Sequence, residues 1–256
     1  MRYNVSVLDN KTEHPQGKAW KEKKAMQNEI QQETWKHLVG VEAAKLVEDG
    51  MVIGLGSGTT ATHLVYALAR RIADGLRIVG AVPTSRATEQ LARDLGIPLT
   101  DLDTHPELDL DIDGADEIDE QLNLVKGGGG ALLREKIVAA ASRRFVVIAD
   151  ITKLVEQLGR GTPVPVEVIP FALTPVSRRL EALGARGRVR QLGETRYYTD
   201  NGNLIVDCFF ANGLADPQEF HQHVCDIVGV VETGLFLHMT ELAIIGGPDG
   251  VKYISL

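Results

Sequence analysis

Apolar residues along the first two thirds of the chain predict helices and strands in alternation. Short apolar runs, typical of buried strands, cover residues 51–55, 78–82 and 145–149, and residues 108–112 alternate Leu and Asp as in a strand end that faces water on one side. A helical repeat ends at Gly50, and its apolar members are Trp35, Leu38, Val39, Ala43, Leu46 and Val47. Helical patterns also run through residue 72 and over residues 86–95. Strands that alternate with helices predict βαβ units and a mainly parallel sheet.

The pattern changes after about residue 161. Strands are predicted for residues 164–169, 196–199, 204–210 and 230–236, and helices for residues 176–183 and 217–227. Asn201-Gly202 is a strong hairpin signal between the second and third of these strands. This order predicts a small α+β module of ferredoxin-like type. A last buried strand, residues 243–247, is expected to return to the large sheet.

The predicted elements divide the chain into three parts. Residues 1–28 are polar and lack sustained periodicity, so we expect an extension that is disordered or loosely attached. Residues 29–161 and 237–256 are expected to form the large catalytic domain. Residues 162–236 are expected to form the inserted α+β domain.

Composition narrows the classes of function. Apolar residues make up 44% and charged residues 24%, enough to bury a core. A net charge of −8 argues against nucleic acid or an anionic membrane surface as a partner. Cys208 and Cys225 form no disulfide or CxxC pattern. With no secretory signal and no run near the roughly 18 apolar residues of a membrane helix, we expect a cytoplasmic protein.

Three alternate glycines lie between a predicted strand and a predicted helix. Glycines let the backbone approach an anion, and free N–H groups at a helix start point at it. A tight turn capped by Thr59 is the plainer alternative. We favour a phosphate site because three alternate glycines exceed what a turn needs. Since no Gly-Lys-Ser/Thr is present, the segment is not a Walker loop for a nucleotide. The segment is Gly54-Leu55-Gly56-Ser57-Gly58-Thr59-Thr60.

An acidic segment, residues 109–120, satisfies the spacing of a calcium-binding EF-hand loop. Such a loop lies between two helices, whereas prolines precede this segment and four glycines follow it. Leu110 and Ile112 instead alternate as in a strand. We therefore expect a strand end that carries Asp113 and Asp116 into a cleft at the sheet's carboxyl edge. Composition alone leaves a solvated acidic loop about equally open.

Four glycines follow a lysine in Lys126-Gly127-Gly128-Gly129-Gly130. Their N–H groups are candidates to stabilise an oxyanion, with the positive charge of Lys126 beside them. Glu135 falls in the first turns of the next helix. A flexible hinge with Glu135 as a helix-dipole residue is the alternative, and we favour the functional interpretation.

Other chemistry-bearing residues give weaker signals. Lys36 and Lys153 are isolated lysines of the kind that is usually solvated. His221, His223 and Cys225 suggest a metal site, but residues 221 and 223 point apart on a helix. We interpret these three as ordinary residues and expect no metal site.

Taken together, the motifs resemble ribose-5-phosphate isomerase of the A type. The matching segments, in the family's order, are GLGSGTT from Gly54, AVPTS from Ala81, DGADEID from Asp113, KGGGGALLREK from Lys126, PVEVIP from Pro165, TDNGN from Thr199 and GGPDGV from Gly246. The resemblance implies a Rossmann-like sheet with helices on both faces, an inserted α+β domain, and a homodimer or homotetramer. It also implies interconversion of ribose 5-phosphate and ribulose 5-phosphate through an enediol, without a cofactor or metal, in the non-oxidative pentose phosphate pathway.

Matching positions imply roles for individual residues. Glu135 resembles the catalytic base, and Asp113, Asp116 and Lys126 resemble catalytic or sugar-contacting residues. The implied phosphate and substrate contacts are Lys36, Ser57, Gly58, Thr59, Thr60, Asp113, Gly114, Ala115, Asp116, Lys126, Gly127, Gly128, Gly129, Gly130 and Lys153. A sugar-phosphate sensor, an amino-sugar-phosphate deaminase, a CoA-transferase and a calcium-binding module remain as alternatives.

Overall fold

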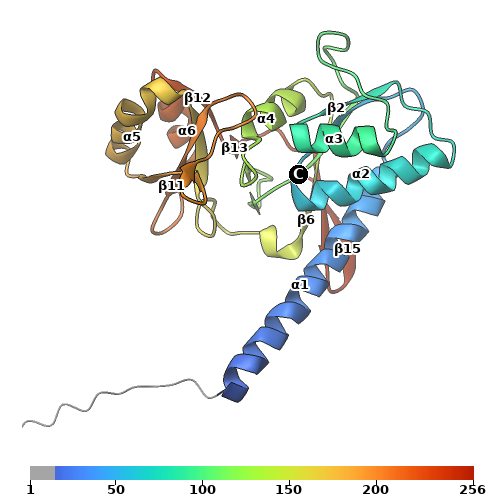
Figure 1. The fold of residues 1–256 in the computed structure, drawn as a ribbon, viewed down its shortest axis with the longest axis horizontal. Coiled ribbons are helices and arrows are strands. Elements are labelled where there is room, and N and C mark those ends of the chain that lie inside the picture. Colours follow the sequence, from blue (N-terminus) through green and yellow to red (C-terminus); the bar gives the residue numbers. More distant parts are fainter. Residues whose placement is uncertain (1–14) are drawn as a thin grey trace, which may run out of the picture. The chain divides into compact units, whose positions relative to one another are not determined.

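The computed structural model describes residues 15–256 (Figure 1). Helix α1 spans Pro15–Ala44, so residues 15–28, where a loose extension was expected, are helical. The first fourteen residues of that expected extension lie outside the described residues. Trp35–Leu256 form one compact unit, which contains every site discussed below.

A six-stranded sheet forms the centre of this unit. Its order is β15-β14-β6-β3-β1-β2, and all neighbours are parallel except the β14–β15 hairpin. The mainly parallel sheet is therefore confirmed. Strand β15 was not predicted, because it is an edge strand whose residues are half-buried or exposed. The strands are β1 Val52–Leu55, β2 Gly80–Pro83, β3 Leu110–Gly114, β6 Phe145–Asp150, β14 Leu242–Gly247 and β15 Gly250–Ile254.

The strand order reverses at the carboxyl ends of β1 and β3. The chain leaves β1 to form β2 on one side and later returns to form β3 on the other. Open parallel sheets bind ligands at such a reversal point. The glycine segment after β1 and the acidic segment that ends β3 both lie there.

Helices cover both faces of the sheet. On one face, α2 (Gly58–Ala73) and α3 (Arg86–Asp94) bury Leu64 and Ala92 against strand residues such as Ile53 and Ile112. On the other face, α4 (Leu132–Ala140) buries Val138 beside β1. Below α4, a three-stranded sheet joins β13 (Leu235–Phe236), β5 (Leu124–Val125) and β4 (Glu117–Ile118).

A second, four-stranded sheet has the order β12-β7-β11-β8, and its neighbours are antiparallel. Helices α5 and α6 pack on it, and the chain order is β7-α5-β8-β11-α6-β12. This is the ferredoxin-like arrangement that the sequence predicted. The elements are β7 Val164–Val168, α5 Leu173–Ala182, β8 Arg186–Val189, β11 Leu204–Phe209, α6 Pro217–Cys225 and β12 Val230–Thr233.

The predicted hairpin of residues 196–199 with residues 204–210 is wrong. Strand β11 pairs with β8 and β7, whereas β10 (Thr195–Arg196) pairs with β9 (Gln191–Leu192). The turn itself exists, and the Thr199 N–H donates to the Asn203 carbonyl across it at 2.9 Å. Strands β7 and β8 take both edges of β11, so residues 196–199 have no edge left to pair with. The predicted strand 230–236 is also two strands, which join different sheets on either side of Gly234.

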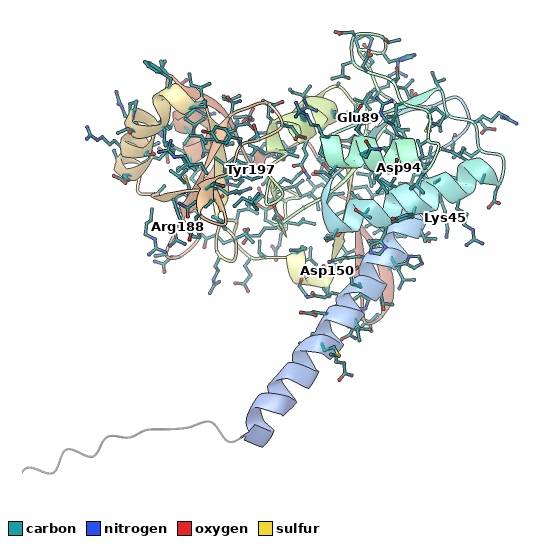
Figure 2. All side chains as sticks on the ribbon, in the orientation of Figure 1. Lys45, Glu89, Asp94, Asp150, Arg188 and Tyr197 are labelled. Atoms are coloured by element: carbon teal, nitrogen blue, oxygen red, sulfur yellow. The ribbon has the colours of Figure 1, made fainter. Side chains whose placement is uncertain are left out.

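Short 3₁₀ helices η1 (Ile151–Lys153) and η2 (Pro170–Ala172) complete the elements. Strands of the large sheet come from residues 52–150 and 242–254, and those of the four-stranded sheet from residues 164–233. This fits an insertion, although the domain limits themselves stay a prediction. Across the described residues, no helix combines the length and apolar character that crossing a bilayer requires. Figure 2 shows how densely side chains fill both regions.

Candidate active site

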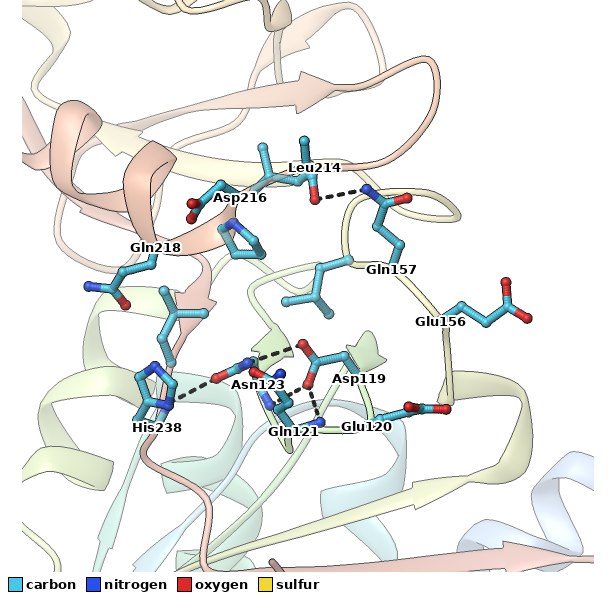
Figure 3. A pocket seen from close by; sticks show the side chains of 14 residues that line it. Asp119, Glu120, Gln121, Asn123, Glu156, Gln157, Leu214, Asp216, Gln218 and His238 are labelled. Carbon is cyan, nitrogen blue, oxygen red and sulfur yellow. Dashed lines mark hydrogen bonds between the residues drawn. The ribbon is translucent and has the colours of Figure 1, made fainter.

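A pocket of about 330 Å³ lies apart from every residue that the sequence predicts for the site (Figure 3). Its lining is acidic, with Asp119, Glu120, Glu156 and Asp216. The Asp119 carboxylate is already occupied by the N–H groups of residues 121 and 123. His238 also lines the pocket, but the hydrogen bond it makes there comes from its backbone N–H, which donates to Asn123 Oδ1 at 3.0 Å, so we place the chemistry elsewhere.

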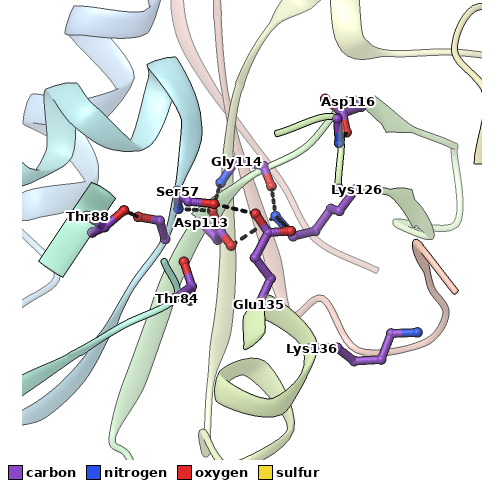
Figure 4. Close-up of polar contacts among 12 residues, drawn as sticks. Ser57, Thr84, Thr88, Asp113, Gly114, Asp116, Lys126, Glu135 and Lys136 are labelled. Atoms are coloured by element: carbon purple, nitrogen blue, oxygen red, sulfur yellow. Dashed lines mark hydrogen bonds and ion pairs between the residues drawn. The ribbon is translucent and has the colours of Figure 1, made fainter. Parts of the chain in front are cut away.

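The predicted catalytic residues converge at the carboxyl edge of the large sheet (Figure 4). Asp113 lies in β3, Ser57 follows β1, Lys126 follows β5, and Glu135 lies in the first turn of α4. Asp113, Lys126 and Glu135 are at most 4% exposed. Four elements therefore bring together residues that are up to 78 positions apart in the chain.

Lys126 lies at the centre of the cluster. Its Nζ donates to the carbonyl of Gly114 at 2.5 Å, lies 2.9 Å from Asp113 Oδ2, and is 3.4 Å from Glu135 Oε2. Burial alone would lower the pKa of Lys126, but the carboxylates of Asp113 and Glu135 outweigh it and raise the pKa. The ammonium is thus a fixed positive charge at neutral pH.

Glu135 has the character of a general base. Burial raises its pKa, Lys126 opposes this rise, Asp113 adds to it, and the result is about 7. The Ser57 hydroxyl donates to Glu135 Oε1 at 2.5 Å, which favours the ionised form. A carboxylate with a pKa near the working pH can both accept a proton and return it.

The two predicted aspartates have different surroundings. Asp113 accepts the N–H groups of Ser57 at 2.9 Å and Gly114 at 2.7 Å on Oδ1, and it pairs with Lys126 through Oδ2. Asp116 does not join this ion pair; its Oδ2 accepts the N–H of Gly128 at 2.7 Å. Asp113 therefore holds Lys126 and the β1 turn, whereas Asp116 holds the glycine loop.

Close packing explains why three of the four loop positions are glycine. A Cβ at Gly127 would lie 2.7 Å from Leu132, one at Gly128 would lie 2.7 Å from the Asp116 carboxylate, and one at Gly130 would collide with Tyr197. Gly127 and Gly130 also have positive φ. Only Gly129 of the four has open space around the position of a Cβ. Within the described residues its N–H donates no hydrogen bond, so it is available to a ligand.

The start of α2 fits an anion. Its first turn contains no acidic residue, and the Ser57 side chain does not cap it but turns to Glu135. Gly58 has φ +85, and Thr59 and Thr60 follow in the first turn. The helix N-terminus and its dipole are thus unblocked for a phosphate.

The remaining predicted contacts lie along the same sheet edge. Gly114 and Ala115 are half-buried between Asp113 and Asp116. Lys153 is half-buried in η1, directly after β6, and within the described residues it makes no hydrogen bond to the cluster. Lys36 is half-buried on α1, next to Trp35, whose carbonyl lies against Gly246 of β14.

The acidic segment is no calcium loop. Residues 110–114 are strand β3, Asp109 accepts the N–H of Val52, and the carboxylate of Asp113 is held by Lys126. Asp111 is fully buried, and neither of its carboxylate oxygens has a hydrogen-bond partner in the described chain. Burial raises its pKa, and the Asp113 carboxylate adds to the rise.

One group of ligand-type side chains lies outside the site. The ligand atoms of His221, Cys225 and Glu232 are within 4.8 Å of one another, so residues 221 and 225, four apart on α6, share a side of the helix. His223 is not part of the group. The Glu232 carboxylate already pairs with Lys136 at 2.7 Å, which places a positive charge where an ion would sit.

Sequence reasoning missed three contacts of the site. It expected Ser57 among the phosphate and substrate contacts, which stays a prediction, but it did not foresee that the Ser57 hydroxyl donates to Glu135. It also missed Arg190 and Tyr197, which donate to carbonyls of the glycine loop. Both come from the four-stranded region, 60 or more residues along the chain, and no local motif marks them.

A buried carboxylate with a pKa of about 7 beside a fixed ammonium can transfer protons, and the unblocked helix N-terminus along the same sheet edge can hold an anion. This is the equipment of an α/β enzyme that moves protons on a phosphorylated substrate, and comparison with known proteins identifies the class as an isomerase. The family model for ribose 5-phosphate isomerase A (phosphoriboisomerase A) matches residues 80–250. A ribose-5-phosphate isomerase A from Roseiflexus sp. (strain RS-1) is 56% identical over 211 residues, which cover 82% of this chain and 90% of that protein.

Solved structures agree. A ribose 5-phosphate isomerase A from Methanocaldococcus jannaschii superposes with a TM-score of 0.83 at 42% identity, covering 88% of this chain and 99% of that one. A D-ribose-5-phosphate isomerase in complex with phospho-erythronic acid gives a TM-score of 0.84 at 37% identity, with the same coverage. The chain belongs to the ribose 5-phosphate isomerase A family.

Proposed function

We propose that this isomerase interconverts D-ribose 5-phosphate and D-ribulose 5-phosphate through an enediol, in the non-oxidative branch of the pentose phosphate pathway. The observation that carries the proposal is the Glu135 carboxylate, buried between Ser57 and Lys126 with a pKa of about 7. Family membership supports the substrate.

The proposed reaction moves one proton. Glu135 takes the proton from C2 of the open-chain aldose, and the electron pair forms the C1–C2 double bond while O1 becomes an oxyanion. The hydroxyl proton of O2 then moves to the O1 oxyanion, the protonated Glu135 returns its proton to C1, and the electron pair left on O2 forms the C2 carbonyl. A positioned base contributes about 10²–10⁴-fold in rate.

The negative charge on the enediolate requires fixed positive partners. Lys126 is held in place by Asp113 and Gly114, and the N–H of Gly129 points from the loop without an internal acceptor. Fixed donors stabilise a developing charge without reorganising during the reaction. A relative is solved in complex with phospho-erythronic acid. The carboxylate of such an acid resembles an enediolate in being planar and negatively charged, which supports the proposed intermediate.

We further propose that the phosphate is bound at the start of α2 by Gly58, Thr59 and Thr60, with Lys36 and Lys153 nearby. Binding energy from the phosphate would then position C1 and C2 at the base. For Asp113 we propose that it orients Lys126. Ring opening by Asp113 stays a prediction, since three donors already occupy its carboxylate.

Two properties rest on the family resemblance and composition. We propose a homodimer or homotetramer, which light scattering coupled to size-exclusion chromatography would measure. We also propose a cytoplasmic location and an inserted domain over residues 162–236.

The test is an assay of ribose 5-phosphate conversion with excess EDTA, beside glucosamine 6-phosphate deamination and CoA transfer. Rapid conversion in EDTA, without the other two activities, is the expected result. Conversion in D₂O should also place deuterium at C1 of the ketose when the base exchanges with solvent. A folded protein without conversion would refute the proposal, and activity that EDTA abolishes would refute the metal-free mechanism.

A further inference from the structure

The glycine loop is held from outside the sheet-edge cluster. Arg190 Nη1 donates to the carbonyl of Gly127 at 2.7 Å and to that of Gly128 at 3.0 Å. The Tyr197 hydroxyl donates to the carbonyl of Gly129 at 3.2 Å. Three consecutive carbonyls of the loop therefore point to side chains from the segment between β8 and β11.

Arg190 is itself fixed by a carboxylate. Its Nε lies 3.0 Å from Asp207 Oδ2, and its Nη2 lies 2.5 Å from Asp207 Oδ1. The two side chains are only 14% and 13% exposed. When two nitrogens of a planar guanidinium bind one carboxylate, they fix the direction of the third nitrogen as well. Asp207, on β11, thus aims Nη1 of Arg190 at the loop.

The direction of the carbonyls decides the direction of the N–H groups. In a planar trans peptide, the carbonyl of one residue and the N–H of the next point in opposite directions. The Gly127–Gly128 peptide follows this rule, since its carbonyl faces Arg190 and its N–H faces Asp116. The Gly128–Gly129 peptide has its carbonyl on Arg190 as well. Its N–H therefore points away from Arg190, to the side of Asp116.

We infer that Arg190 is a positioning residue for catalysis: it orients the peptide units of the glycine loop so that the N–H of Gly129 faces the enediolate. Four glycines have high conformational freedom, and the hydrogen bond within the loop, from the Gly130 N–H to the Gly127 carbonyl at 2.9 Å, does not involve the Gly128–Gly129 peptide. That peptide therefore needs an external contact to keep one orientation. Arg190 and Tyr197 supply that constraint without touching the substrate. This inference rests on the proposed function, and it adds a part of the four-stranded region to the catalytic machinery.

The test compares Arg190→Gln with Arg188→Gln as a matched control. Arg188 lies two residues earlier, is labelled in Figure 2, and stacks 5.5 Å from the Phe209 ring, with no hydrogen bond to the loop among the described residues. We expect Arg190→Gln to lower kcat about 10–100-fold, because a small misplacement of a catalytic donor has effects of that order. KM should change less than about threefold. Arg188→Gln should keep the wild-type kcat.

Inhibition by phospho-erythronic acid is a second measurement, and it should not change if Arg190 has a purely structural role. If the loop donor acts on the enediolate, Arg190→Gln should weaken this inhibitor by about the same factor as it lowers kcat. Tyr197→Phe, which removes one neutral hydrogen bond, should lower kcat only a few-fold. Circular dichroism and thermal melting confirm that each variant is folded.

A folded Arg190→Gln with kcat within twofold of wild type would overturn the inference, as would an equal loss in Arg188→Gln. If Arg190→Gln does not fold, Arg190→Lys replaces it. Lysine keeps the charge but cannot hold Asp207 and the loop together. A folded Arg190→Lys with wild-type kcat would then overturn the inference. An inactive wild type would refute the proposed function itself, so the two failures are distinguishable.

Discussion

Two neighbouring residues of α4 belong to ion pairs that differ in kind. Lys136 lies 2.7 Å from Glu232 and also donates to the carbonyl of Thr233 at 2.8 Å. Glu135 lies 3.4 Å from Lys126, a longer separation. Lys136 and Glu232 form a pair of one cation and one anion. Lys126, by contrast, is shared between Asp113, Glu135 and the carbonyl of Gly114.

The difference shows how proton chemistry is made available in a buried site. Where one cation meets one carboxylate directly, both charges are compensated and the pair is structural. Where one cation serves two buried carboxylates, the more distant one is left partly uncompensated. Burial then raises the pKa of Glu135 to about 7 despite the attraction of Lys126. Sharing, more than proximity, distinguishes the pair that contains the proposed base from the structural pair.

The strongest way to break this comparison is Glu135→Gln, which keeps the shape and removes the base. We expect kcat to fall about 10²–10⁴-fold. KM should change little, because the phosphate site at α2 is untouched. Steady-state kinetics on the folded variant measure both, and equal losses of kcat and substrate affinity would contradict a catalytic role for Glu135.

Lys126→Met should produce the next largest effect. Loss of the ammonium removes enediolate stabilisation, with an expected loss of roughly 10²-fold or more in kcat. It also leaves Asp113 buried without its ion partner, which costs about 3–5 kcal/mol of unfolding free energy. Adding Asp113→Asn should restore stability in urea titrations but not activity. Recovery of activity in the double variant would show that Lys126 is only structural.

Glu232→Gln tests whether the Lys136–Glu232 pair is only structural. Lys136 loses its partner in a mostly buried place, so we expect about 1–3 kcal/mol of destabilisation, less than for a fully buried pair. The kcat measured at a temperature well below unfolding should stay within about twofold of wild type. A large loss of kcat in a stable protein would mean that both pairs of α4 act in catalysis.

The smallest change is Ser57→Ala, which tests the origin of the Glu135 pKa. The hydrogen bond from Ser57 lowers this pKa, so its removal should raise it. Because the base acts in its ionised form, kcat/KM of the wild type should fall as the pH drops below about 7. In Ser57→Ala this acid limb should move to higher pH. A shift to lower pH would show that the hydroxyl does not stabilise the carboxylate.

Sequence patterns predicted much of this molecule for a physical reason. Buried parallel strands are continuous apolar runs, so β1 and β6 were recognised, whereas β3 was recognised from its alternating pattern. Motifs beside these strands placed Asp113, Lys126 and Glu135 at one edge. The edge strand β15 and the weakly apolar β8 lack that signal. The hairpin prediction failed because β8, which carries no strand signal, pairs with the edge of β11 that the hairpin needed.

The same limit applies to the site. The contact between Ser57 and Glu135 joins residues 78 apart, and Arg190 reaches the glycine loop from 62–63 residues away. Neither contact has a sequence period or a spacing that would reveal it. Tertiary packing alone determines which hydroxyl meets the base and which arginine meets the loop.

The central claim is that a shared cation leaves Glu135 with a pKa near 7. Its most direct test is a pH titration by NMR of protein labelled with ¹³C at the glutamate side-chain carboxyl, with Glu135→Gln as the blank. The resonance that is missing from the blank should titrate with a midpoint near 7. A midpoint at or below the ordinary glutamate value of about 4.3 would contradict the claim, because Lys126 would then compensate Glu135 fully.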